Sequence, residues 1–217
     1  MDHASNTATV TNSGAISGTT AGSGDAAGVY ALNANATVTN AGTGAVTAQA
    51  TGWGHAYGVY AGGIATVDNA VTSSITATAS GGEAYAVLAD TALVTNHGTL
   101  SATGVDAYGA RGSGDITVNN DGHMSAVAST GSSYGVNAFS AVSGIATVSN
   151  SGVIEASSQG AAYGVMAISA NVTNSGSITA ASSAGGASFG VWGYNAAVTN
   201  SGTVSATNSA GGEASGV

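Results

Sequence analysis

The stretch Ala146-Thr147-Val148-Ser149-Asn150-Ser151-Gly152 is followed at once by Val153-Ile154-Glu155-Ala156 and, after a short gap, by Ala162-Tyr163-Gly164-Val165. Versions of this unit recur along the 217 residues at intervals of 24 to 30 residues. The most constant feature is an Asn two residues after a Val, found at Asn12, Asn40, Asn69, Asn96, Asn120, Asn150, Asn174 and Asn200. A period of this length is typical of stacked supersecondary units rather than of one globular core.

Each unit contains three short segments in which residues alternate with period two, the pattern of half-buried strands. The first segment holds the Val and the Asn, the second holds one larger apolar residue such as Ile154, and the third holds the Tyr-Gly-Val motif. We therefore predict an all-β fold, a parallel β-solenoid of about eight turns of 24–30 residues with three short strands per turn. The usual handedness of parallel crossovers favours a right-handed coil. The repeat has no linker, so residues 1–217 are predicted to form a single domain.

Equivalent residues of successive units would lie on top of one another in such a stack. Inward-pointing Asn amides can donate to and accept from each other along the axis, which satisfies polar groups that are buried. We interpret the eight Asn residues as a structural ladder. The aromatic ring of the third segment is expected to share the inner face with the Val two positions later and to stack in the core. These rings belong to Tyr57, Tyr85, Tyr108, Tyr134, Tyr163 and Phe189.

Charge and composition exclude several classes of partner. The chain has ten acidic residues and a formal charge of −9, and Arg111 is its single Lys or Arg. Such a surface cannot neutralise a row of phosphates, so we expect no nucleic-acid binding and no attraction to an anionic membrane. No run of 18 apolar residues occurs, which predicts no membrane insertion by this segment. The last unit stops within its third segment at Val217, and we expect the chain to be a piece of a longer array.

Candidate catalytic and metal-binding patterns are weak. Gly131-Ser132-Ser133-Tyr134-Gly135 matches a nucleophile motif, but that motif has meaning only at a strand-to-helix elbow. The four His residues fall in different registers, and the Gly-Ser-Gly-Asp stretches lack the nine-residue period of calcium-binding repeats. Carbohydrate hydrolysis needs two facing carboxylates, for which Asp115 with Asp121, or Glu83 with Asp106, are the candidate pairs. We predict no enzyme activity and no cofactor.

Two outward columns are better candidates for binding. The residue three positions after the aromatic ring varies from unit to unit, which suggests exposure. This candidate binding column consists of Tyr30, Tyr60, Leu88, Arg111, Asn137, Met166 and Trp192. The first segment also carries alternating hydroxyls, as in Thr37 and Thr39, and a regular Thr-x-Thr grid resembles the ice-binding face of β-solenoid antifreeze proteins. The grid is interrupted at Asp68, Leu93, Asn119, Asn171 and Ala197.

The units Ala146–Gly152, Val153–Ala156 and Ala162–Val165 resemble the Gly-, Ala-, Ser- and Asn-rich repeats of Gram-negative autotransporter passenger domains and related large surface adhesins. The resemblance covers essentially the whole chain. It implies a secreted or bacterial cell-surface β-helix, held at the outer membrane by segments absent here, that acts in adhesion, aggregation or biofilm formation. No functional residue can be transferred from it, because the matching positions are structural.

The leading hypothesis is therefore a structural or adhesive surface stalk with a host-surface protein or glycan as partner. The first alternative is a filament subunit that associates end to end, because open strand edges pair with other chains. A carbohydrate-active β-helix enzyme or an ice-binding solenoid is the further alternative.

Overall fold

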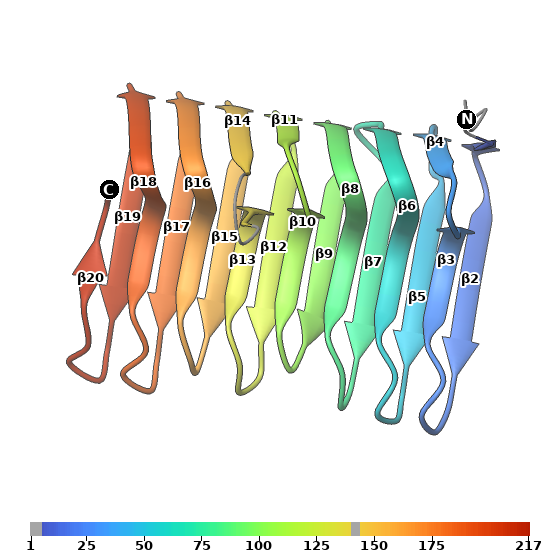
Figure 1. Cartoon of the computed structure of the whole chain (residues 1–217), viewed down its shortest axis with the longest axis horizontal. Coiled ribbons are helices and arrows are strands. Elements are labelled where there is room, and N and C mark those ends of the chain that lie inside the picture. Colours follow the sequence, from blue (N-terminus) through green and yellow to red (C-terminus); the bar gives the residue numbers. More distant parts are fainter. Residues whose placement is uncertain (1–5, 140–143) are drawn as a thin grey trace.

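The computed structural model, which describes residues 6–139 and 144–217, is a parallel β-solenoid of about eight turns. Figure 1 shows the turns following one another along the long axis, with the two ends of the chain at opposite ends of the rod. Every strand pairing is parallel. The described residues contain no helix. The fold predicted from the repeat is confirmed.

The second segments of the units form one sheet of eight strands. Its members are β2 (Ala15–Thr20), β5 (Ala45–Ala50), β7 (Ser74–Ala79), β9 (Thr99–Gly104), β12 (His123–Ala128), β15 (Val153–Ser158), β17 (Ser177–Ser182) and β19 (Thr203–Asn208). The register stays constant along this sheet, so that Met124 pairs with Leu100 on one side and with Ile154 on the other. One column of large apolar side chains results.

The first and third segments form the other sheet, which has twelve strands. The separate strands are β1 (Thr7–Asn12), β3 (Ala26–Ala31), β4 (Asn35–Asn40), β10 (Ala107–Gly112), β11 (Ile116–Asn120), β13 (Ser133–Ala138), β14 (Ile145–Asn150) and β20 (Ala214–Ser215). The long strands are β6 (Ala56–Asn69), β8 (Ala84–Asn96), β16 (Ala162–Asn174) and β18 (Ser188–Asn200). Each long strand contains a third segment and the first segment of the next unit.

At four places, β6, β8, β16 and β18, the third segment and the next first segment therefore form one long strand. In β8 only Asp90 and Thr91 lie between the part that pairs with β10, which ends at Ala89, and the part that pairs with β11, which begins at Ala92. Between β3 and β4 the chain bends instead, with Asn33 in the left-handed region at a φ of 53°. Ser113-Gly114-Asp115 separates β10 from β11 in the same way. The length and residue type of each connection decide between one long strand and two short ones.

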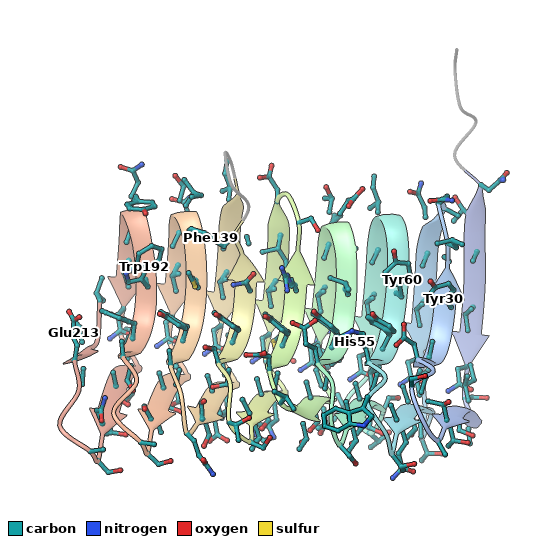
Figure 2. All side chains as sticks on the ribbon, turned by 60° about the horizontal axis from the view of Figure 1, so that its bottom comes forward. Tyr30, His55, Tyr60, Phe139, Trp192 and Glu213 are labelled. Atoms are coloured by element: carbon teal, nitrogen blue, oxygen red, sulfur yellow. The ribbon has the colours of Figure 1, made fainter. Side chains whose placement is uncertain are left out.

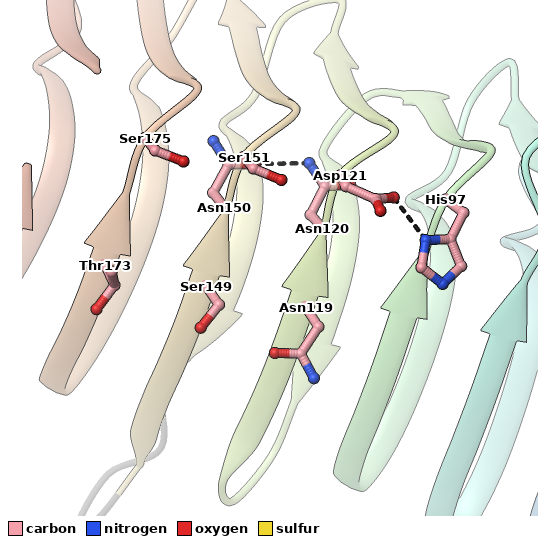
Figure 3. Close-up of a pocket in the computed structure, with 9 residues that line it drawn as sticks. All are labelled: His97, Asn119, Asn120, Asp121, Ser149, Asn150, Ser151, Thr173 and Ser175. Atoms are coloured by element: carbon pink, nitrogen blue, oxygen red, sulfur yellow. Dashed lines mark hydrogen bonds and ion pairs between the residues drawn. The ribbon is translucent and has the colours of Figure 1, made fainter. Parts of the chain in front are cut away.

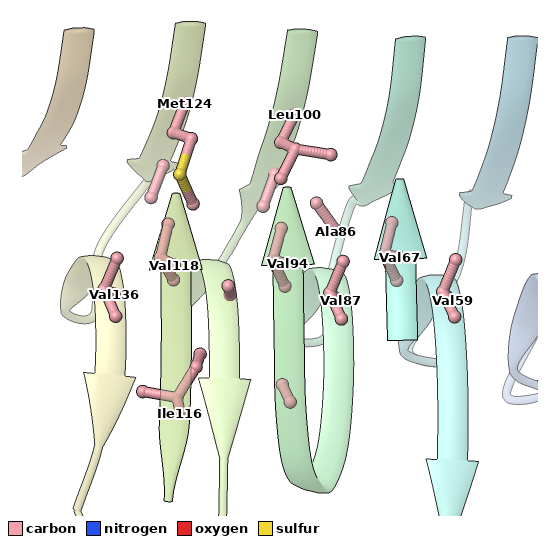
Figure 4. Packing of buried hydrophobic residues seen from close by; sticks show 14 of the residues in the cluster. Val59, Val67, Ala86, Val87, Val94, Leu100, Ile116, Val118, Met124 and Val136 are labelled. Carbon is pink, nitrogen blue, oxygen red and sulfur yellow. The ribbon is translucent and has the colours of Figure 1, made fainter. Parts of the chain in front are cut away.

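The core is a narrow set of aliphatic columns between the two sheets. Leu100 and Met124 of the eight-stranded sheet lie opposite Val94 and Val118 of the twelve-stranded sheet, as Figure 4 shows. All four are buried, and Ala side chains fill the space beside them. Small side chains let the two sheets approach closely, so the interior is filled by the columns that the repeat predicts.

The aromatic rings lie outside this aliphatic cluster, although Tyr85 and Tyr108 are themselves buried. This corrects the expectation that each ring shares a face with the Val two positions later. The buried apolar cluster contains Val59 and Val87 but none of the Tyr residues. Gly58 and Val59 both lie on the inner side, and the register passes from Tyr57 to Val59 without a ladder pair at Gly58. The strand therefore turns a corner at the Gly, and the corner places Tyr57 on the outer surface.

Close packing explains why that corner is Gly. A Cβ at Gly58 would lie 2.6 Å from Ile75 Cγ2 and 2.5 Å from the carbonyl oxygen of Ala86. We expect Gly58→Ala to lower the free energy of unfolding by about 1–3 kcal/mol, the usual cost of overpacking. Gly14→Ala is the control, since a Cβ there meets no atom within 4 Å. Chemical denaturation of both variants measures the difference, and equal midpoints would contradict the packing of this corner.

Candidate interaction surfaces

The eight Asn residues form the predicted ladder, and it runs in one direction. The Nδ2 of each Asn donates to the Oδ1 of the Asn in the next turn. The N···O distances are 2.9 Å for Asn12–Asn40 and Asn40–Asn69, 2.8 Å for Asn69–Asn96, and 2.7 Å for Asn96–Asn120, Asn120–Asn150, Asn150–Asn174 and Asn174–Asn200. The second Nδ2 hydrogen is donated to backbone carbonyl oxygens in the adjoining bends. The buried amides are therefore paired on both sides.

The two ends of the ladder differ. Asn12 Oδ1 accepts from the N–H of Gly14, and Asn200 Nδ2 donates to the carbonyl oxygen of Gly202. Asn12 is still buried, whereas Asn200 is exposed. One end of the rod thus presents amide acceptors and the other presents amide donors, an order that the sequence alone does not reveal.

A second ladder, made of aromatic rings, follows the outer surface of the third segments. Its ring centroids lie 5.4 Å apart for Tyr57–Tyr85, 4.7 Å for Tyr85–Tyr108, 4.8 Å for Tyr108–Tyr134, 5.2 Å for Tyr134–Tyr163 and 5.7 Å for Tyr163–Phe189. The planes of successive rings are inclined by 5° to 13°. Since the rings stack face to face along the axis, their faces cover one another, and the rings of Tyr85 and Tyr108 are buried.

The candidate binding column packs beside this aromatic ladder. Tyr30 is 53% exposed and stacks on Tyr60 at 4.6 Å. The guanidinium carbon of Arg111 lies 4.7 Å from the ring centroid of Tyr108, a cation–π contact. Figure 2 shows Tyr30 and Tyr60 near one end of the rod and Trp192 with Phe139 toward the other.

The remaining members of the candidate binding column are less exposed than their variation from unit to unit suggests. Leu88, Met166 and Trp192 are half-buried, and Asn137, which was expected on the surface, is buried at 4% exposure. Trp192 contacts the rings of Phe139 and Tyr194. The structure therefore breaks the column into aromatic groups at its two ends, with Arg111 over the tyrosines between them. Its role in binding stays a prediction.

Burial changes the ionisation of the tyrosine hydroxyls. Burial, together with the nearby carboxylates of Asp25 and Glu83, raises the pKa of Tyr57 to about 12. The pKa of Tyr85 is raised by burial and by the hydrogen bond that its hydroxyl donates to Glu83 Oε2 at 2.5 Å. Burial also raises the pKa of Tyr108, Tyr134 and Tyr163. All five rings thus favour the neutral phenol in the folded chain.

This shift predicts alkaline unfolding. A pKa raised by folding stabilises the fold below the unfolded value of about 10, and that stability is lost as the pH rises toward the folded value. We expect the ladder tyrosines to stay protonated at pH values where the unfolded chain ionises, and Tyr57 to ionise near pH 12. Absorbance at 295 nm and circular dichroism, recorded together, measure this, with the chain in denaturant as the control. Ionisation of all tyrosines near pH 10 with the fold intact would contradict it.

Several acidic side chains accept hydrogen bonds at the bends between turns. Asp25, Asp106 and Asp115 each accept, through Oδ1, the backbone N–H of a residue in the next turn, at 2.8, 2.5 and 3.0 Å. Glu83 accepts from Tyr85. Each side chain of the two candidate carboxylate pairs therefore has its own structural partner. Among the described residues no group of three or more His, Asp or Glu could hold a metal ion.

Every His in the described part of the chain faces an acid of the following turn. His97 Nδ1 lies 2.6 Å from Asp121 Oδ1, His123 Nε2 lies 3.2 Å from Glu155 Oε2, and His55 Nδ1 lies 3.6 Å from Glu83 Oε2. His55 Nδ1 also accepts the backbone N–H of Glu83 at 3.1 Å. These contacts lie in or next to the bends, at the rim of the rod.

One surface hollow was not predicted. It has a volume of about 250 Å³, and we call it the polar trough (Figure 3). Its walls are strand residues and bend residues of successive turns, and its floor is part of the Asn ladder. The lining residues are Asn119, Ser149 and Thr173 from strands, His97, Asp121, Ser151 and Ser175 from bends, and Asn120 and Asn150 from the ladder. A second hollow is lined by Ile145 of β14, by Ser169 and Asn171 of β16, and by residues 195–197 of β18.

The trough gives a role to two features of the sequence. Asn119 breaks the Thr-x-Thr grid, yet it lies in register with Ser149 and Thr173 and extends the polar wall. The variable residue after each ladder Asn, which is His97, Asp121, Ser151 or Ser175, forms the opposite wall. The sequence suggested Asp121 only as one of a pair of carboxylates and did not connect these four positions. Their polar character along four successive turns is the signal that could have revealed the trough.

No known protein-family model matches the chain, and the comparisons with curated proteins and with solved structures found no similar protein. The described residues contain no helix that is long and apolar enough to cross a membrane.

Proposed function

We propose that the chain is a rigid structural and adhesive stalk, exposed on a cell surface or secreted, whose outer faces contact a glycan or a protein. The observation that carries this proposal is the contrast between a constant interior and a varied surface. The interior consists of invariant Asn, Val and aliphatic columns that are buried and paired. Most of the varied side chains lie on the outer faces and in the bends, outside the aliphatic core.

The architecture supports such a role in physical terms. Each turn contacts its neighbours through three strand columns, so bending the rod would break hydrogen bonds in both sheets at once. A stiff rod holds its surface groups at fixed distances, as a stalk or display scaffold requires. The resemblance of the repeats to autotransporter passenger domains points to the same role and to a Gram-negative cell surface.

Surface display tests this function. The chain is fused to a membrane anchor on a non-adherent Gram-negative bacterium, and cell settling and attachment to glycan-coated or protein-coated surfaces are measured. We expect the folded chain to increase attachment or clumping. The matched control is the Val148→Asp chain, which has the same length and nearly the same composition but a disrupted core. Equal attachment with both chains would contradict an adhesive role.

A second candidate function is the filament subunit, which the direction of the Asn ladder favours. A donor end and an acceptor end are complementary, so two copies can join head to tail in the register already used inside the chain. The residues 7–12 and 195–200 occupy equivalent positions of the stack. Negative-stain electron microscopy across a concentration series tests this candidate. Filaments with a repeat of one rod length would support it, and discrete rods at every concentration would contradict it.

A further inference from the structure

We infer that the polar trough binds an uncharged polysaccharide strand that lies along the rod axis, with one sugar residue per turn. This inference rests on the proposed adhesive function and names its partner. The trough is open at the surface, and every side chain in its lining carries a hydroxyl, amide, carboxylate or imidazole group. Such walls offer hydrogen-bond donors and acceptors in the directions that sugar hydroxyls use.

The periodicity of the trough carries the argument. Asn119 pairs in register with Ser149, and Ser149 pairs with Thr173, so each turn adds one strand side chain to the wall. Each turn also adds one bend side chain, as Asp121 and Ser151 do. Successive parallel strands lie about 4.8 Å apart, which is close to the length of one pyranose residue in an extended glycan. Each sugar residue of a homopolymer therefore meets one polar strand side chain and one polar bend side chain.

The floor of the trough is preorganised. Asn120 Nδ2 donates to Asn150 Oδ1 at 2.7 Å and to the carbonyl oxygen of Val153 at 3.1 Å, so the ladder fixes both residues. The strands on either side are locked in register by the sheet. A ligand would not have to order this surface, and the entropy cost of binding is correspondingly small.

Charge selects a neutral ligand over an acidic one. Asp121 is the single acid in the lining, and His97 faces it at 2.6 Å. No Lys or Arg lines the trough, and Arg111, the only such residue in the chain, packs on Tyr85 and Tyr108. A phosphate, sulfate or uronate group would find no cation here and would meet a chain with a formal charge of −9.

No Tyr, Trp or Phe lines the trough, so hydrogen bonds must hold the sugar. Each of these replaces a hydrogen bond to water, which leaves little net gain. We expect a dissociation constant on the order of 1 mM for a single short oligosaccharide. Many copies displayed on one cell would raise the overall affinity by multivalency.

The test is a titration of the ¹⁵N-labelled folded chain with cellotetraose, xylotetraose and mannotetraose, followed by two-dimensional NMR. We expect at least one of them to shift the amide signals of residues 119–122, 149–152 and 173–176, while tetragalacturonate leaves them in place. Ser149→Val with Ser151→Val should abolish the shifts. Thr9→Val with Thr11→Val, on the outer face of the first turn, should not.

Unmoved trough signals with all three uncharged tetrasaccharides at about 20 mM, well above the expected dissociation constant, would overturn the inference. Shifts of equal size along the whole rod, or shifts that survive in the Ser149→Val, Ser151→Val variant, would overturn it as well. If ice-crystal growth is instead blocked by the chain and restored by the same double variant, the face binds ordered water and the inference is overturned. The cell-attachment experiment tests the stalk function separately, and its result does not depend on the sugar titration.

Discussion

Replacing Val148 with Asp is expected to lower the free energy of unfolding by about 4 kcal/mol or more, because it places an unpaired carboxylate in the core. Val148 is 1% exposed and pairs in register with Val118 on one side and Val172 on the other. Apolar side chains surround it, so the new charge has no partner and no access to water. Thermal and chemical denaturation, followed by circular dichroism, measure the loss.

Thr147→Asp is the matched control for this variant. Thr147 lies on the same strand and is exposed, so the same negative charge stays in water. A pH series adds a second check. Burial raises the pKa of an Asp above its usual value of about 3.9, so the penalty is full at pH 7 and shrinks as the pH falls and the carboxyl is protonated. Equal melting of Val148→Asp and the parent chain would show that this column does not face inward.

Asn120→Leu is expected to cost about 2–4 kcal/mol, although Leu has nearly the same size and is more apolar. The substitution removes the only donor that the ladder supplies to Asn150 Oδ1 and the acceptor of Asn96 Nδ2. Both partners stay buried, and a buried polar atom without a partner costs more than the hydrogen bond itself contributed. Chemical denaturation compares this variant with the parent chain.

Two controls isolate the ladder from general effects of the substitution. Asn119→Leu changes the adjacent, exposed residue of the same strand and should alter stability little. Asn200→Leu removes the exposed end of the ladder, which has one Asn neighbour instead of two, and should cost less than Asn120→Leu. If all three variants lose the same stability, the interior ladder is not what holds successive turns together.

Much of this fold could be predicted from the sequence because each structural role recurs in every unit. The Val, Asn and larger aliphatic positions keep their residue type, and the sheet pairs each with its own copy, as Val148 pairs with Val118 and Val172. Equivalent residues of successive units therefore lie next to one another in the stack and contact one another. The prediction of a parallel solenoid needed no other information.

Two features of the structure escaped this reasoning. Period-two alternation assumes a straight strand, whereas the corner at Gly58 places two successive residues inside and moves Tyr57 outside. Exposure of the varied column was inferred from variation alone, whereas Asn137 is buried. In both cases the local path of the backbone decided the outcome, and the repeat pattern does not encode that path.

The polar trough escaped for another reason. Its walls come from residues that are separate in sequence, such as Asp121 and Ser149, and they meet only because adjacent turns align in register. In a single unit each of these residues is an ordinary strand or bend residue. A site built from residues of successive turns can be recognised only when the register between the turns is known.

The central claim is that a directional, buried Asn ladder holds successive turns in one register and makes the rod rigid. Hydrogen exchange of the Asn side-chain amides, followed by NMR on the ¹⁵N-labelled folded chain, tests it most directly. The account predicts slow exchange for the Nδ2 hydrogens of Asn69, Asn96, Asn120 and Asn150, and fast exchange for those of the exposed Asn119 and Asn200. Fast exchange of all of them in the folded chain would contradict the ladder.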